Sequence, residues 1–180
     1  DNKGQVWFHT ESGLCVYQPY RRNFKKINFK KPGEESFPIT SFFQDSHGLI
    51  WMSVPGDNLY VLDTVKNSFT VYTSVWPEFP NKILSIVEDK YNGYYWLNTE
   101  NGLAVYDTKK REYYHQNNNP GGMKCFFSSA IFSRPDFIYK DNNDILWIHK
   151  KINGAGSVIN RFDIRNNELI TVQNKGNAFG

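Results

Sequence analysis

The stretch Asp45-Ser-His-Gly-Leu-Ile-Trp51 recurs in variant form along this chain of 180 residues. The other three copies are Asp1-Asn-Lys-Gly-Gln-Val-Trp7, Asp89-Lys-Tyr-Asn-Gly-Tyr-Tyr-Trp96 and Asp141-Asn-Asn-Asp-Ile-Leu-Trp147. Successive tryptophans are therefore 44, 45 and 51 residues apart. Self-similarity at a period of this size is typical of repeat architectures such as propellers and solenoids.

A second matched block follows each tryptophan and keeps the same register. The four blocks cover residues 13–18, 58–63, 102–107 and 158–163. A bulky apolar residue then stands six positions after the end of each block, as Phe24, Phe69, Tyr113 and Leu169. Because four units hold these offsets together, we interpret the chain as four copies of one supersecondary unit.

Each unit is predicted to form four short strands, because β-branched and aromatic residues dominate the matched segments. The second strand runs through the tryptophan, the third is the matched block and the fourth carries the bulky residue. The first strand is expected at 39–44, 83–88 and 135–140. Asp at the first position of the following link and Gly at its fourth suit a type I turn. Asp144 takes the glycine position in the last unit, and Asp tolerates a left-handed backbone.

Four antiparallel strands repeated at about 45 residues predict β-propeller blades. We therefore expect an all-β fold, a partial β-propeller that forms one fragment over residues 1–180. Its repeats cover about 1–37, 38–81, 82–133 and 134–180 on the repeat period. The first repeat lacks its first strand, which indicates a piece cut from a longer propeller.

The repeated residues are expected to have structural roles. Large aromatic side chains fill the gap between twisted sheets, so the repeated tryptophans should be largely buried at equivalent positions. The repeated aspartates should form the turns. The residues concerned are Trp7, Trp51, Trp96 and Trp147, and Asp45, Asp89 and Asp141. Neither set is a catalytic array, and no cofactor or metal site is expected. Cys15 and Cys125 are interpreted as reduced thiols, with a single disulfide as the alternative.

The composition restricts the function classes. The net charge is only +3, and aromatic residues make up 17% of the chain, which favours a folded domain over disorder. No apolar run is long enough for a transmembrane helix, and no signal peptide opens the chain. Six cations lie within residues 21–31, but this run crosses a turn, a strand and a loop. We expect a solvated edge there, and no nucleic-acid binding through this segment.

The motifs Asp-x-x-Gly-x-Ile-Trp and Gly-Leu-x-x-Tyr-Asp, with an aromatic residue six positions later, resemble the two-component-regulator propeller repeat over essentially the whole chain. Such repeats build the periplasmic sensor regions of hybrid two-component histidine kinases in Bacteroides-type bacteria. The resemblance implies a periplasmic segment of an inner-membrane sensor histidine kinase, which senses oligosaccharides or other small ligands and starts a phosphorelay. It also implies contact with neighbouring blades of the same chain and a homodimeric receptor. The chain departs from the family at His9, Ser53, Asn98 and His149, which replace the usual glycine two residues after each tryptophan.

The variable loops indicate where a ligand would bind. The loops between the second and third strands, and between successive units, lie on one rim and differ in length. The first candidates for ligand binding are loops 115–134 and 149–157, together with the tryptophan outside the repeat register. The ligand-binding candidates on this rim are Trp76, Phe79, Arg134, Lys150 and Lys151. The alternative is that Trp76 folds onto its own blade and that the cations are ordinary solvated charges.

Two other functions stay open on the sequence. One is a generic protein-interaction scaffold. The other is a propeller lyase that uses His9 and His149 as general bases. Ser53 and Asn98 occupy the same position in the other two units, and no carboxylate pair accompanies the histidines. The pattern therefore favours a non-enzymatic segment.

Overall fold

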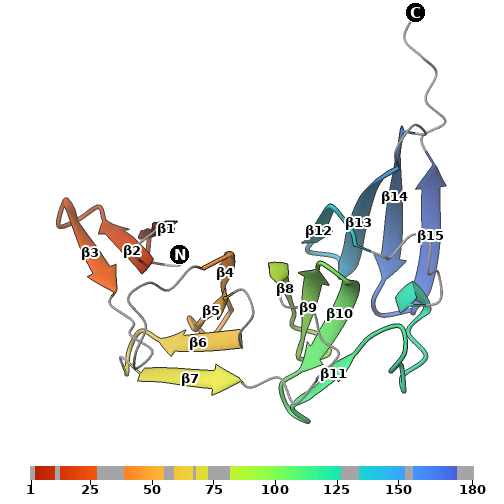
Figure 1. Cartoon of the computed structure of the whole chain (residues 1–180), viewed down its shortest axis with the longest axis horizontal. Coiled ribbons are helices and arrows are strands. Elements are labelled where there is room, and N and C mark those ends of the chain that lie inside the picture. The colour runs from red at the N-terminus through yellow and green to blue at the C-terminus, as the bar shows by residue number, and fades with distance from the viewer. Residues whose placement is uncertain are drawn as a thin grey trace, which may run out of the picture. The chain divides into compact units, whose positions relative to one another are not determined.

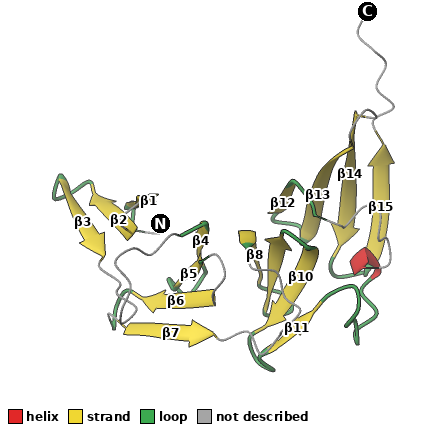
Figure 2. Cartoon of the chain, in the orientation of Figure 1, coloured by secondary structure: helices red, strands yellow, loops and turns green. Residues whose placement is uncertain are grey.

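The computed structural model describes residues 3–10, 13–27, 39–54, 59–66, 68–72, 82–126, 134–152 and 156–173. Within these ranges the chain is all-β, apart from the short 3-10 helix η1 (Lys124–Phe126) (Figure 2). Four antiparallel sheets follow one another along the chain, and each is built from strands that are consecutive in sequence (Figure 1). This arrangement confirms the expected class, a series of propeller blades.

Each sheet is one blade. The described part of blade one has three strands, in the order β1-β2-β3, and each of the other blades has four. Blade one contains β1 (Val6–Thr10), β2 (Gly13–Gln18) and β3 (Asn23–Ile27). Blade two contains β4 (Ser41–Gln44), β5 (Ile50–Ser53), β6 (Leu59–Asp63) and β7 (Ser68–Tyr72). Blade three contains β8 (Ile83–Asp89), β9 (Tyr94–Thr99), β10 (Gly102–Asp107) and β11 (Glu112–Tyr114). Blade four contains β12 (Phe137–Lys140), β13 (Ile145–Ile152), β14 (Gly156–Asp163) and β15 (Glu168–Gln173).

The strand register explains the sequence offsets. The bulky residue after each six-residue block pairs with the fifth residue of that block. The four pairs are Tyr17 with Phe24, Leu62 with Phe69, Tyr106 with Tyr113, and Phe162 with Leu169. The repeated tryptophans also lie opposite the same block position, as Trp7 with Val16, Trp51 with Val61, Trp96 with Val105, and Trp147 with Arg161. The sequence repeat is therefore a repeat of cross-strand neighbours.

The chain forms two compact units, Asp1–Ile83 and Leu84–Gly180. The first contains blades one and two, and its core includes Leu14, Ile50 and Met52. The second contains blades three and four, and its core joins Trp96 and Val105 of blade three to Leu146 and Ile148 of blade four, among others. In both units the core lies between two successive sheets, because alternate side chains of each strand point to opposite faces.

The turns between the first and second strands use the left-handed backbone that the sequence indicates. The φ angle is +81° at Gly48, +73° at Gly93 and +60° at Asp144. Asp144 therefore adopts the glycine conformation of the equivalent turns, as expected. These turns, together with those between the third and fourth strands, lie at one end of each blade, which we call the turn rim. The opposite end is the loop rim.

Candidate functional site

In blades two and four, the aspartate that precedes the second strand bonds both to its own turn and to the tryptophan. In blade two, Asp45 Oδ1 accepts hydrogen bonds from the amides of His47 and Leu49, both at 2.9 Å. Its Oδ2 accepts the Trp51 indole N–H at 2.8 Å. Blade four repeats this pattern around Asp141, with Trp147 Nε1 3.1 Å from Asp141 Oδ2. The aspartate thus has a second role beyond the expected turn, which is to orient the indole of the same unit.

Hydrogen bonding also controls the acidity of the blade-four aspartate. Desolvation raises the pKa of Asp141, but the hydrogen bonds from the Trp147 indole and from the amides of Ile145 and Asn143 outweigh it. The pKa of Asp141 is therefore lowered from its usual value of 3.8. The charged form is the one that holds the turn.

Blade three breaks the pattern because its turn has one more residue. The side-chain amide of Asn92 donates to Asp89 Oδ2 at 2.9 Å, which is the oxygen that the indole uses elsewhere. Trp96 Nε1 is consequently buried without a hydrogen-bond partner. Asp89 itself is fully buried. The inserted residue has therefore replaced an interaction between turn and strand with one inside the turn.

The burial of the four tryptophans differs from the expectation. Trp51 and Trp96 are 2% and 1% exposed. Trp7 and Trp147 are only half-buried. Trp147 alternates with Leu146 and Ile148, which face blade three, so its indole lies on the opposite face of blade four. Trp7 lies on β1, which is the edge strand of the described part of its sheet.

Of the sequence-predicted ligand residues, the structure places three on the loop rim of blade four. Phe137 pairs with His149, so Arg134 before β12 and Lys150 and Lys151 after His149 lie at the same end of the sheet. Arg134 and Lys151 are exposed and Lys150 is half-buried. The Lys151 amide donates to Asp136 Oδ2. Trp76 and Phe79 lie outside the described residues, so ligand binding by this set stays a prediction.

The first half of loop 115–134 does not line the loop rim as expected. Cys125 and Phe126 of η1 are 0% and 2% exposed and belong to the core of their unit. The Lys124 amide donates to Asn167 Oδ1 at 2.8 Å, and Asn167 Nδ2 donates to the Gly122 carbonyl at 3.1 Å. Asn167 belongs to the turn between β14 and β15. Residues 122–126 thus lie at the turn rim of blade four, where burial of Cys125 and Phe126 in the core holds them.

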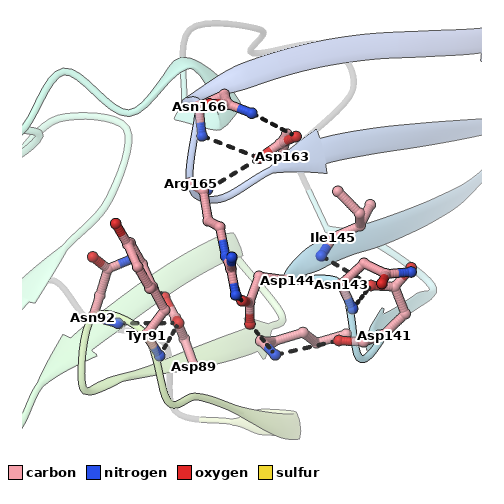
Figure 3. A network of polar contacts seen from close by, with 11 residues as sticks. Asp89, Tyr91, Asn92, Asp141, Asn143, Asp144, Ile145, Asp163, Arg165 and Asn166 are labelled. Carbon is pink, nitrogen blue, oxygen red and sulfur yellow. Dashed lines mark hydrogen bonds and ion pairs between the residues drawn. The ribbon is translucent and has the colours of Figure 1, made fainter.

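A polar network that the sequence analysis did not identify joins blades three and four at the turn rim (Figure 3). Arg165 Nε donates to Asp144 Oδ2 at 2.7 Å, and Arg165 Nη2 also pairs with this oxygen. Lys140 Nζ lies 2.8 Å from Asp144 Oδ1. The Arg165 guanidinium lies over the ring of Tyr91 in blade three, 5.2 Å from its centroid. One arginine therefore links both turns of blade four to the turn of blade three.

The same network sets the charge states. Hydrogen bonds from Lys140 and Arg165 lower the pKa of Asp144 from 3.8, although desolvation opposes them. The Asp144 carboxylate raises the pKa of Arg165. The sequence signal for this network is that Asp144 replaces a glycine, but the partner, Arg165, is 21 residues away.

At the equivalent place in the first unit there is a hollow of about 350 Å³. Its walls come from the turn of blade one and from both turns of blade two. They include Lys3, Gln5, Gln44, His47, Asp63 and Thr64. A second hollow of about 320 Å³ shares Gln5 and Gln44 with it and is otherwise lined by Val6, Trp7, Phe42 and Ile50. A polar hollow and an apolar one thus adjoin between blades one and two.

The described residues contain no group of His, Cys, Asp and Glu that could hold a metal ion. Cys15 and Cys125 are both free thiols, as the first interpretation of the sequence had it. Burial raises the pKa of the Cys125 thiol, which is a core side chain rather than a reactive group. No helix in the described ranges has the length and hydropathy needed to cross a membrane.

No protein-family model matches the chain, and no curated protein matches its sequence. Solved structures do match its fold. The extracellular domain of the proposed hybrid two component system BT3049 from B. thetaiotaomicron matches 97% of this chain and 27% of its own, with a TM-score of 0.58 and 16% identity. That of the proposed hybrid system BT4673 from the same organism matches 80% of this chain and 18% of its own, with a TM-score of 0.60 and 21% identity.

A third match is PorZ, a surface component of the type-IX secretion system of Porphyromonas gingivalis. It covers 94% of this chain and 25% of its own, with a TM-score of 0.63 and 11% identity. This chain has the fold of these proteins. It spans between 18% and 27% of their length. At these identities the likeness concerns the fold, and the function has to be argued from the site.

Proposed function

We propose that this chain is a ligand-sensing, periplasmic propeller segment of a two-component sensor histidine kinase that responds to oligosaccharides. The observation that carries the proposal is the match to extracellular domains of two proposed two-component systems, one of which covers 97% of this chain. The repeat motifs of the sequence support the same family. In this role the segment binds and transmits, and catalysis belongs to other parts of the receptor.

The two compact units each bury their own core, so each can stay folded while their arrangement changes. A sensor needs a change of this kind. A ligand that binds one arrangement of such units more tightly than another shifts the population between them. Signalling requires this difference in affinity between two states, since a ligand that binds both equally changes nothing.

The proposal is tested on the intact receptor in membrane vesicles. Autophosphorylation is measured with and without a panel of neutral and acidic oligosaccharides, and a response to at least one of them is expected. A phosphorylation level that no saccharide changes, in a receptor that is active as a kinase, would contradict the proposed function.

A protein-interaction scaffold is the second candidate. It is favoured by an exposed apolar face on blade four, where Phe137 and Tyr139 are 55% and 54% exposed and Ile170 and Val172 are each 48% exposed. An apolar face of this kind can bind a further blade or another protein. Under this reading the receptor response to saccharides is absent, while substitutions on the blade-four face disrupt assembly.

A further inference from the structure

The turn rims of the two units differ at equivalent positions. Arg165 stands two residues after Asp163, and Val65 stands two residues after Asp63. Tyr91 stands two residues after Asp89, and Lys3 stands two residues after Asp1. Gly48 comes three residues after Asp45, and Asp144 comes three residues after Asp141.

These differences decide whether the space between the turns is filled. In the second unit, the Arg165 guanidinium bonds to Asp144 and lies over Tyr91, so these side chains occupy space between the turns (Figure 3). In the first unit, Val65 and Gly48 have neither a guanidinium nor a carboxylate. The result is the hollow of about 350 Å³, a volume within the range of small-molecule binding sites.

We propose that this hollow is a binding site for one sugar unit of a neutral oligosaccharide. The inference rests on the proposed function and gives it a location at the turn rim of blades one and two, separate from the loop-rim candidates Arg134, Lys150 and Lys151 of blade four. Its chemistry is that of polyol recognition, in which each group meets a ligand hydroxyl that both donates and accepts hydrogen bonds.

The polar wall supplies groups that match hydroxyls. Gln44 Nε2 donates to the Gly48 carbonyl at 3.3 Å, which orients the amide and leaves its oxygen as an acceptor. The Thr64 hydroxyl and the imidazole of the exposed His47 can each donate and accept. Asp63 contributes carboxylate oxygens to the same wall. The adjoining second hollow adds Trp7 and Phe42, whose rings suit the C–H face of a sugar.

The wall is held in place before any ligand arrives. Asp45, which is 3% exposed, fixes the turn that carries His47 through three hydrogen bonds. Asp63 fixes the other turn by accepting from the amides of Val65 and Lys66, both at 2.9 Å. Pre-ordered polar groups lose little conformational freedom on binding, so the site favours affinity.

The proposed site can be filled by copying residues of the second unit into the equivalent positions of the first. The double variant Gly48→Asp, Val65→Arg introduces the Asp144 and Arg165 pair into the first unit. An added Cβ at Gly48 has its nearest neighbour, Gln44 Nε2, at 4.0 Å, and Asp144 shows that aspartate adopts a φ of +60° in this turn. The matched control, Asp144→Gly with Arg165→Val, opens the equivalent place in the second unit and leaves the hollow of the first unit unchanged.

Binding is measured by calorimetry on the full chain with neutral oligosaccharides of glucose, xylose, arabinose, mannose and galactose. We expect one of these series to bind, the closing variant to lose at least about tenfold in affinity, or about 1.4 kcal/mol, and the control to bind like the parent. Gln44→Ala, which removes the side-chain amide but not the backbone hydrogen bonds of the turn, should also weaken binding. Its circular dichroism spectrum and that of the closing variant report whether each has folded.

Three other results would each contradict the proposal that the hollow binds a saccharide. If the folded closing variant and Gln44→Ala bind a saccharide with parent affinity, the hollow is not the site, while the oligosaccharide function stands. If Lys150→Ala with Lys151→Ala abolishes binding instead, the ligand lies on the loop rim. If no saccharide binds the chain at millimolar concentration, the hollow is not a saccharide site, and the receptor phosphorylation assay decides the proposed function separately.

Discussion

At the scale of single residues, the aspartate of the first turn and the tryptophan of the second strand are hydrogen-bonded to each other in blades two and four. Asp45 connects two turn amides to the Trp51 indole, and both side chains are almost fully buried. Removing the indole leaves a cavity and takes one hydrogen bond from the Asp45 carboxylate. Trp51→Ala should therefore destabilise the chain by about 3–5 kcal/mol, the usual range for truncating a large buried aromatic residue.

Urea denaturation followed by circular dichroism measures this change. Trp51→Phe, which keeps most of the volume and loses the N–H donor, separates packing from hydrogen bonding and should lie between the parent and Trp51→Ala. A Trp51→Ala variant that unfolds at the parent's urea concentration would show that the blade register is wrong.

Acidity is a second property at the residue scale. The pKa of Asp144 is lowered by its hydrogen bonds to Lys140 and Arg165, so its folded-state pKa lies below the ordinary 3.8. A depressed carboxyl pKa contributes stability that is present above the unfolded-state pKa and is lost as the pH falls through the folded-state pKa. The second unit should therefore lose stability below about pH 4, where unfolded carboxyls take up protons.

Urea midpoints between pH 7 and pH 2.5 test this dependence. Asp144→Asn should be less stable than the parent at pH 7 and should lose less stability on acidification. Parallel pH profiles for the two proteins would show that the Asp144 network does not contribute to acid sensitivity.

At the scale of elements, the turn of blade three tests how the unit tolerates an insertion. Deleting Asn92 gives the six-residue spacing between aspartate and tryptophan that the other blades have. The Trp96 indole should then reach Asp89, and satisfying this buried donor should raise the free energy of unfolding by about 1 kcal/mol. Thermal melting of the deletion variant, beside Asn92→Ala, measures the change. A deletion variant less stable than Asn92→Ala would refute the interpretation that the insertion displaced the indole bond.

The elements also show what a sequence can predict. Cross-strand neighbours keep constant offsets, so Phe69 opposite Leu62 and its counterparts could be placed without a structure. The positions of Cys125 and Phe126 could not, because they depend on a space that only the packed blades create. Asp144 was expected to be left-handed, but its pairing with Arg165 joins two turns that local patterns do not connect. The hollow between blades one and two could not be predicted, because its walls come from three turns that only the fold brings together.

At the scale of the whole molecule, the repeated mode of packing defines which face of a blade needs a neighbour. The tryptophan face of blade three packs against Leu146 and Ile148 of blade four. The same face of blade four carries Trp147, which is half-buried, and the exposed Phe137 and Tyr139. Burying apolar surface contributes a free energy of about 25 cal/mol per Å². The exposed face of blade four is therefore stabilised by contact with a further blade or with a second copy of the chain.

We therefore expect the isolated chain to self-associate through the blade-four face. Sedimentation velocity should show an average mass that rises with protein concentration, and Phe137→Lys with Tyr139→Lys should shift the chain toward monomer because like charges then face each other across the contact. The charge-matched control, Val65→Lys with Thr70→Lys, lies on exposed positions of blade two and should leave the association unchanged. A parent chain that stays monomeric at every concentration would contradict the expectation.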